Sequence, residues 1–264
     1  MPLGPDARPG RPTVVLFDLD DTLLDHGKAM RQAVDHVHAA FRLAASLDEF
    51  HRNWSDASER HYSRYLAGEI SFAEQRRARV RDAVGQGLSV GAVDEILGQF
   101  IAEYERRWIL FDDVLPCLQS LSGFRLGLLS NGAAREQRRK LASLGLLSCF
   151  EIVLTSEEAG AAKPDAAIFL RACEALGVAP AEAIYVGDRC DLDAVAARRA
   201  GLDGVWLNRR RKGHPLAATV NAIAGLDELA PLLRERARKI IGALKLNRRA
   251  LRIPPRPPPP RGRG

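Results

Sequence analysis

The hydrophobic pattern of the chain alternates between short, unbroken apolar runs and longer segments with apolar residues at helical spacing. Unbroken runs are typical of strands that are buried on both faces, as in a parallel sheet. They predict strands at residues 14–17, 125–129, 151–154, 183–186 and 204–207. Helices are expected at residues 113–123, 135–144, 165–176, 192–200 and 226–236. This strand–helix series predicts an α/β fold, a parallel sheet with helices on both faces.

A different pattern fills the chain between the first two strands. Residues 27–108 are rich in Ala, Arg, Gln, Glu and Leu, and their apolar residues form helical stripes, of which Val34, Val37 and Phe41 are one. Breaks at residues 47–48, 68–71 and 85–89 divide the segment into four expected helices. The pattern therefore predicts a small helical bundle inserted into the α/β domain.

The positive charge of the chain is concentrated at its C-terminal end. The 264 residues carry a formal charge of +6, but residues 231–264 alone carry +10 and the remaining 230 residues carry −4. We therefore expect residues 241–264 to be a basic Pro/Arg-rich tail. Residues 1–12 are polar and rich in Pro and Gly, and we expect them to be a disordered lead. No nucleic-acid partner is expected apart from weak contacts of that tail.

Cysteine usage and hydropathy indicate the cellular compartment. The four cysteines are widely spaced and form no metal-finger pattern, so we expect free thiols in a reducing environment. No apolar run approaches the roughly 20 residues that a membrane helix needs. The run after the polar N-terminus is too short for a signal peptide. The sequence thus predicts a cytoplasmic protein with no membrane partner and leaves its oligomeric state open.

Acidic side chains follow two of the expected strands. Asp18 and Asp20 come directly after the first strand, and Asp188 comes after the fourth, with Asp191 and Asp193 close behind it. In open α/β sheets, ligands bind beyond the carboxyl ends of the strands, so these acids should converge. Two like charges about 4 Å apart repel by about 4 kcal/mol at a surface-like dielectric. The pattern therefore predicts a hard divalent cation bound by oxygens, which we take to be Mg²⁺.

Hydrogen-bond donors follow the other two strands. Ser130, Asn131 and Gly132 come after the second strand, and Lys163 stands before Pro164 at the start of a helix. Alone, the first group is typical of an ordinary turn and the lysine is typical of a solvated surface. Beside a metal and its carboxylates, the same groups could bind the oxygens of a phosphate.

Together these segments resemble the four motifs of the haloacid dehalogenase-like (HAD) hydrolase superfamily. They are FDLDDT (17–22), LSNG (129–132), KPD (163–165) and GDRCDLD (187–193), in the order of that family. The resemblance spans residues 13–236. It implies a Rossmann-like core made of residues 13–24 and 112–240, with a helical cap at residues 25–111.

The resemblance also implies a role for each motif residue. Asp18 would be the nucleophile that forms an aspartyl-phosphate, and Asp20 the general acid and base. Substrate would be bound by Ser130, Asn131 and Lys163. Mg²⁺ would lie between Asp18, the backbone carbonyl of Asp20, and Asp188. Supporting residues would be Thr22, Gly132, Asp191 and Asp193, with either Asp191 or Asp193 next to Lys163 or a metal-bound water.

The second acid of the first motif, Asp20, indicates which kind of leaving group the reaction has. A halide leaves without a proton whereas an alkoxide needs one, so Asp20 favours a phosphate monoester over an alkyl halide. We expect a phosphatase for a small nucleotide, sugar phosphate or phosphoglycolate-like ester; the alternatives are a HAD-type phosphomutase and a non-catalytic phosphate sensor. The insert carries aromatic and basic side chains that could select a substrate. They are Trp54, Tyr62, Tyr65, Phe72, Arg76, Arg77 and Arg79. Bundle packing and solvent exposure account for most of them, so we assign none to substrate.

Overall fold

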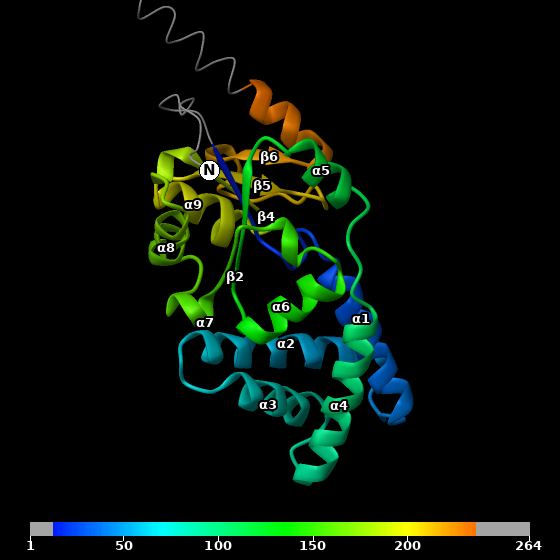
Figure 1. Ribbon diagram of the computed structural model, residues 1–264. Coiled ribbons are helices and arrows are strands. Elements are labelled where there is room, and N and C mark those ends of the chain that lie inside the picture. Colours follow the sequence, from blue (N-terminus) through cyan, green and yellow to red (C-terminus); the bar gives the residue numbers. More distant parts are fainter. Residues whose placement is uncertain (1–12, 236–264) are drawn as a thin grey trace, which may run out of the picture.

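Six parallel strands form a single sheet in the order β3-β2-β1-β4-β5-β6 (Figure 1). The computed structural model describes residues 13–235. Its strands are β1 (Val14–Phe17), β2 (Arg125–Ser130), β3 (Ile152–Thr155), β4 (Ala183–Gly187), β5 (Asp203–Leu207) and β6 (Asn221–Ile223). The first five lie within one residue of their predicted bounds. The sequence analysis missed β6, because two of its three residues are exposed and it contains no apolar run.

Alternate side chains of the central strand pack on opposite faces of the sheet, as the unbroken apolar run predicts. Val14 and Leu16 lie in one cluster with α8 (Ala166–Leu176) and α9 (Ala196–Arg199). Val15 and Phe17 lie in another cluster. That cluster includes residues of α5 (Val114–Ser120), of α6 (Ala134–Ser143) and of the helical segment 229–235. The predicted α/β fold with helices on both faces is confirmed.

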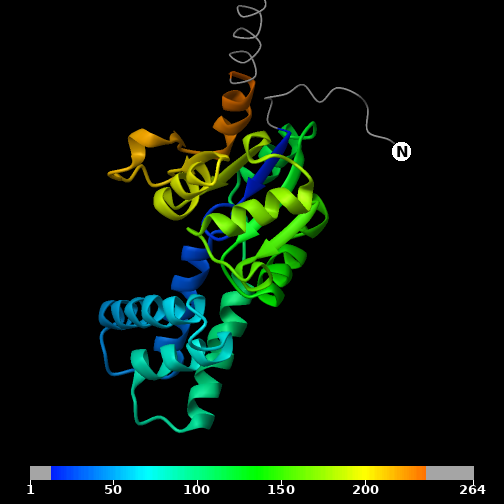
Figure 2. The same ribbon diagram turned by 90° about the vertical axis from the view of Figure 1, so that its left-hand side faces the viewer.

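Four helices form a bundle between β1 and β2, as predicted. They are α1 (His26–Ala40), α2 (Leu47–Leu66), α3 (Phe72–Val84) and α4 (Val90–Arg106). The side chains of Ser46, Ser71 and Ser89 accept backbone N–H groups at the start of α2, α3 and α4, which explains why the helices begin there. Figure 2 shows this bundle, referred to below as the cap, at one end of the α/β core.

The chain after β4 differs from the predicted helix at residues 192–200. It forms a π-helical turn, Cys190–Val195, before α9 begins. The carboxylate of Asp193 accepts the backbone N–H of Arg189 at 2.9 Å inside this turn. A wide turn of this kind directs one side chain back toward the sheet and is common at functional sites.

Three other expectations concern the chain ends, the thiols and membranes. The expected lead at residues 1–12 and the tail at 241–264 lie outside the described residues, so tail contacts stay a prediction. All four cysteines are free thiols, as expected. Among residues 13–235, no helix is both long and apolar enough to cross a membrane. The cytoplasmic location stays a prediction.

Candidate active site

A cavity of about 940 Å³ lies between the carboxyl ends of the strands and the cap. The core contributes Asp18, Ser130, Lys163 and Asp188 to its wall. The cap contributes residues of α2 and α3, including Tyr62. The structure thus brings the four motifs together on one wall of the cavity, as the strand-end argument predicts.

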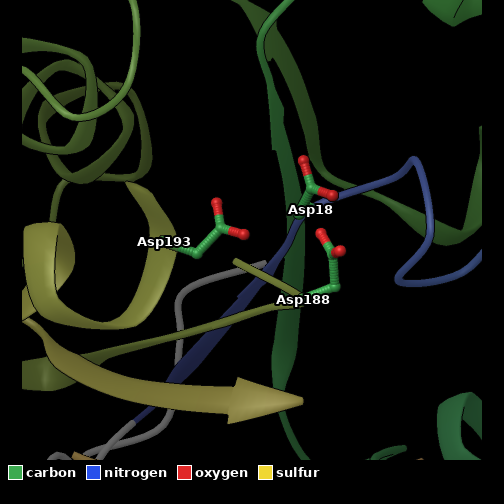
Figure 3. A group of neighbouring side chains, drawn as sticks. All are labelled: Asp18, Asp188 and Asp193. Atoms are coloured by element: carbon green, nitrogen blue, oxygen red, sulfur yellow. The ribbon is translucent and has the colours of Figure 1, made fainter. Parts of the chain in front are cut away.

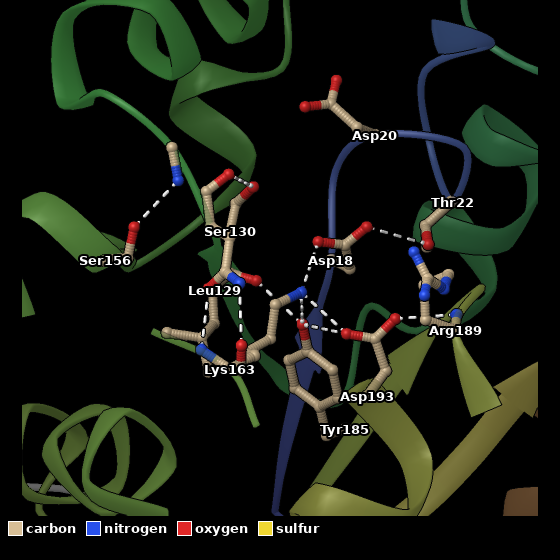
Figure 4. Close-up of polar contacts among 12 residues, drawn as sticks. Asp18, Asp20, Thr22, Leu129, Ser130, Ser156, Lys163, Tyr185, Arg189 and Asp193 are labelled. Carbon is tan, nitrogen blue, oxygen red and sulfur yellow. Dashed lines mark hydrogen bonds and ion pairs between the residues drawn. The ribbon is translucent and has the colours of Figure 1, made fainter. Parts of the chain in front are cut away.

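The ammonium group of Lys163 forms hydrogen bonds with three side chains on the core wall (Figure 4). Its Nζ donates to Asp18 Oδ1 and to Asp193 Oδ1, both at 2.7 Å, and to the hydroxyl of Tyr185 at 2.8 Å. Tyr185 in turn donates to the backbone carbonyl of Leu129 at 2.8 Å. Burial lowers the pKa of Lys163, but Asp18 and Asp193 raise it well above its ordinary value. Lys163 is therefore a buried, charged group held in one position.

Three carboxylates gather beside this ammonium group. Oxygens of Asp18, Asp188 and Asp193 lie within 4.8 Å of one another (Figure 3). Burial raises the pKa of Asp18 to about 7, although Lys163 acts in the opposite direction. Burial and repulsion from the other two carboxylates raise the pKa of Asp188 to about 8. One ammonium group does not balance three carboxylates, so this oxygen-rich group fits a hard divalent cation such as Mg²⁺.

Local contacts explain how Asp18 and Asp193 reach these positions. The buried hydroxyl of Thr22 donates to Asp18 Oδ2 at 3.2 Å, which leaves Oδ1 to Lys163. Gly187 ends β4 beside Asp193, and a Cβ on it would lie 2.4 Å from Asp193 Cγ. Only glycine therefore allows the Asp193 carboxylate to approach the strand so closely.

The side chain of Asn131 joins two loops of the core. Its Nδ2 donates to the carbonyl of Lys163 at 3.0 Å, and its Oδ1 accepts the backbone N–H of Lys163 at 2.8 Å. Next to it, the N–H of Gly132 donates to Ser156 Oγ at 2.9 Å. In this arrangement the Asn131 amide holds the lysine loop against the end of β2, and the residue also lines the cavity.

The carboxylate of Asp20 lies apart from the three grouped carboxylates. Lys140 Nζ donates to its two oxygens at 2.7 and 2.8 Å, and Gln137 Nε2 donates to Oδ2 at 3.0 Å. Gln137 Nε2 also lies 3.0 Å from Ser130 Oγ. Burial raises the pKa of Asp20, but Lys140 and then His26 lower it to about 2. Asp20 is therefore an ionised carboxylate paired with a buried lysine.

Sequence reasoning missed both partners of Asp20. Gln137 and Lys140 lie three residues apart on α6, which follows the LSNG motif, and they therefore share one face of that helix. Both are buried polar residues on a helix that packs against the sheet. Their three-residue spacing on the helix after the LSNG motif was the feature of the sequence that could have indicated a role in the site.

Two acids of the fourth motif have different environments. Asp193 lies 2.7 Å from Lys163, whereas the Asp191 side chain is 46% exposed and its nearest cation is Arg189 at 3.8 Å. The structure therefore places Asp193, and not Asp191, next to Lys163.

Polar contacts connect the cap to the core across the cavity. Tyr62 of α2 donates to the backbone carbonyl of Asn131 at 2.9 Å. Arg76 of α3 pairs with Glu136 of α6. The cap therefore closes over the carboxyl ends of the strands in this structure.

A comparison with known protein families matches residues 12–201 to the haloacid dehalogenase-like hydrolases. The chain belongs to this family. The hydrolase is 33% identical over 201 residues to a glyceraldehyde 3-phosphate phosphatase of Methanopyrus kandleri, covering 74% of this chain and 83% of the relative. It is 34% identical over 221 residues to a phosphoserine phosphatase of Thermus thermophilus, covering 74% and 88%. The hydrolase is thus an enzyme of the phosphoric monoester hydrolase class.

The fold is shared with a solved structure of the same family. The putative HAD-hydrolase YfnB from Bacillus subtilis, bound to magnesium, matches this hydrolase with a TM-score of 0.70 at 23% identity. The match covers 84% of this chain and 99% of that one, so it includes both the sheet and the cap. At this identity the likeness shows the fold alone.

Proposed function

We propose that this hydrolase is a Mg²⁺-dependent phosphatase that cleaves a small phosphate monoester through an aspartyl-phosphate on Asp18. The names of its relatives, a glyceraldehyde 3-phosphate phosphatase and a phosphoserine phosphatase, support small phosphorylated metabolites as the substrate class. The division into a core (13–24 and 112–240, of which 236–240 lie outside the described residues) and a cap (25–111) is part of this proposal. The four helices between β1 and β2 support it.

The position of Asp18 is the observation that carries the proposal. Its carboxylate lies at the end of β1, in the wall of the cavity, with one oxygen bonded to Lys163 and the other to Thr22. These two bonds hold the carboxylate in one orientation, as attack on a phosphorus atom requires. Attack by an Asp18 oxygen breaks the bond from phosphorus to the leaving alkoxide and leaves the phosphoryl group on Asp18.

The charges around Asp18 fit the transferring phosphoryl group. Asp18, Asp188 and the backbone carbonyl of Asp20 would hold Mg²⁺, which when bound supplies positive charge for the phosphoryl oxygens. Lys163 supplies a second positive charge, and Ser130 a hydroxyl on the same wall of the cavity. Asp193 and Asn131 keep Lys163 in place through its side chain and its backbone.

Asp20 is the residue that we propose for proton transfer. Paired with Lys140, its carboxylate is already in the basic form that activates water against the aspartyl-phosphate. The leaving alkoxide needs a proton in the first half of the reaction. For that step Asp20 would act in its protonated form as the general acid, and it returns to the carboxylate when its proton passes to the alkoxide.

Phosphate release from a panel of phosphate monoesters, including p-nitrophenyl phosphate, tests the proposal. We expect turnover that EDTA abolishes and Mg²⁺ restores, and a loss of at least about 10³-fold in Asp18→Asn. Asp48→Asn, at an exposed acid in the first turn of α2, is the matched control and should retain full activity. Turnover that survives both EDTA and Asp18→Asn would overturn the mechanism.

A further inference from the structure

Two buried polar side chains on the cap wall have incomplete hydrogen bonding. Gln75 and Arg79 lie one turn apart on α3, and 1% and 7% of their surfaces are exposed. Arg79 Nη2 donates to Gln75 Oε1 at 2.8 Å. Within residues 13–235, Arg79 Nε and Gln75 Nε2 have no hydrogen-bond partner. Two N–H donors are therefore buried side by side without an acceptor.

The guanidinium group of Arg79 also lacks an ion-pair partner of its own within residues 13–235. Burial lowers its pKa to about 10, and the next cause is another cation, Arg76. Glu136 is the acid that raises the pKa of Arg79, but it is already paired with Arg76 and lies 3.5 Å from Lys140. Among the residues that the structure describes, Arg79 forms no ion pair. A buried charge that is neither paired nor fully hydrogen-bonded is costly, so its retention needs an explanation outside the folded chain.

The position of the two donors supplies that explanation. Gln75 and Arg79 line the same cavity as Asp18 and Lys163, but on the opposite wall, which the cap provides. Arg77, on the same helix, faces away from the cavity and pairs with Asp94 at the surface. A substrate whose phosphate lies at Asp18 extends its leaving group into the space that the cap covers. Gln75 and Arg79 therefore lie on the wall of the cavity that the leaving group would approach.

We propose that Gln75 and Arg79 form a carboxylate-binding subsite, so that the substrate is the phosphate monoester of a small hydroxy acid. Two free N–H groups match the two oxygens of a carboxylate, and one uncompensated positive charge matches its single negative charge. A second phosphate group, with up to two negative charges and three oxygens, would be only partly satisfied there. This inference rests on the proposed phosphatase function, and it adds the group that the cap recognises.

A pair of substrates that differ in one group tests the subsite. 3-Phosphoglycerate and glycerol 3-phosphate differ only in having a carboxylate or a hydroxymethyl group at the far end. We expect wild-type kcat/KM to favour 3-phosphoglycerate by tenfold or more. In Arg79→Met, kcat/KM for 3-phosphoglycerate should fall by about 10- to 100-fold, the range for losing a charge-assisted hydrogen bond. The values for glycerol 3-phosphate and p-nitrophenyl phosphate should stay within about threefold.

Further variants separate this subsite from a merely structural role. Gln75→Leu should lower kcat/KM for 3-phosphoglycerate by about tenfold and leave p-nitrophenyl phosphate unaffected. Arg77→Met removes a cation from the same helix outside the cavity, and it should leave the preference between the two substrates unchanged. Arg79→Met should not lower the unfolding temperature, because it removes an uncompensated buried charge. An equal loss on all substrates, together with a lower unfolding temperature, would show that Arg79 only supports the fold.

The possible results distinguish this inference from the proposed function. Absence of phosphate release from every ester would overturn the phosphatase proposal. Release from p-nitrophenyl phosphate with equal kcat/KM for the matched pair would overturn the subsite and leave the phosphatase in place. A stronger preference for fructose 1,6-bisphosphate, lost in Arg79→Met, would assign the subsite to a second phosphate and overturn the carboxylate.

Discussion

The substitution Gly187→Ala tests whether the approach of Asp193 to the sheet is needed for catalysis. A Cβ on Gly187 would lie 2.4 Å from both Cγ and Oδ2 of Asp193. Ordinary van der Waals contact begins at 3.4 Å, so the Asp193 carboxylate would have to move by about 1 Å. The end of β4 is fully buried, and it pairs with both β1 and β5, so the strand has little freedom to move instead.

The size of the effect follows from what Asp193 holds. Its Oδ1 accepts from Lys163 at 2.7 Å, and its Oδ2 accepts the backbone N–H of Arg189 at 2.9 Å. Overpacking alone costs about 1–3 kcal/mol, and weakening a buried ion pair adds to that, so we expect unfolding to become easier by about 3 kcal/mol. Because a displacement of about 1 Å in a positioning group can cost about 10²-fold in rate, kcat/KM should fall by about that factor.

Urea unfolding and the hydrolysis of p-nitrophenyl phosphate measure the two effects of Gly187→Ala. Gly98→Ala is the matched control, because Gly98 lies in α4 and a Cβ there would meet no atom within 4 Å. The control should stabilise the protein by about 0.5–1 kcal/mol and leave kcat/KM unchanged. If Gly187→Ala unfolds like the wild type and retains its kcat/KM, then Asp193 does not position Lys163 as we infer.

Three other predictions concern the cap, a core ion pair and the metal. Tyr62→Phe removes the cap's hydrogen bond to the carbonyl of Asn131, so kcat/KM should fall by about fivefold and stability by about 1 kcal/mol. Arg209→Met removes two bonds of 2.7 and 2.9 Å to Asp113, which should cost about 1–2 kcal/mol in urea unfolding at pH 7. Burial raises the pKa of Asp113, but its pairing with Arg209 and its bonds from backbone N–H groups lower the pKa overall. The pair therefore stabilises the fold above about pH 4, and this stabilisation is lost as the pH falls. The gap between Arg209→Met and the wild type should therefore narrow in acid, where only the bond from Arg209 to the Thr22 carbonyl remains; a gap independent of pH would contradict the pairing. Mg²⁺ should raise the unfolding temperature of the wild type but not of Asp188→Asn, and an equal rise in both would place the metal elsewhere.

The residues at the strand ends could be predicted because topology alone brings them together. Parallel strands point the same way, so Asp18, Lys163 and Asp188 must meet at one edge once the strands are identified. Identification was straightforward, because strands buried on both faces appear as unbroken apolar runs. The same rule could not find β6, which is mostly exposed, or the π-helical turn that directs Asp193 toward Lys163.

Residues on helices were harder to predict, because their roles depend on how each helix is rotated and docked. Lys140 meets Asp20 because α6 presents its buried face to the first motif, and no local pattern determines that rotation. Arg79 lies on a helix with several arginines, of which Arg77 is partly exposed and Arg79 is buried. Only the docked cap distinguishes the two, so sequence reasoning assigned neither to substrate.

The charges on the two walls of the cavity indicate that the core wall carries out catalysis and that the cap wall selects the substrate. The core wall groups three carboxylates around the single ammonium of Lys163 and so has surplus negative charge that a cation can balance. The cap wall has the opposite surplus at Arg79, which no described residue of this chain balances. A phosphate ester with a distal anion satisfies both walls at once. Substitutions on the core wall should therefore slow all substrates alike, whereas substitutions on the cap wall should slow each substrate according to its leaving group.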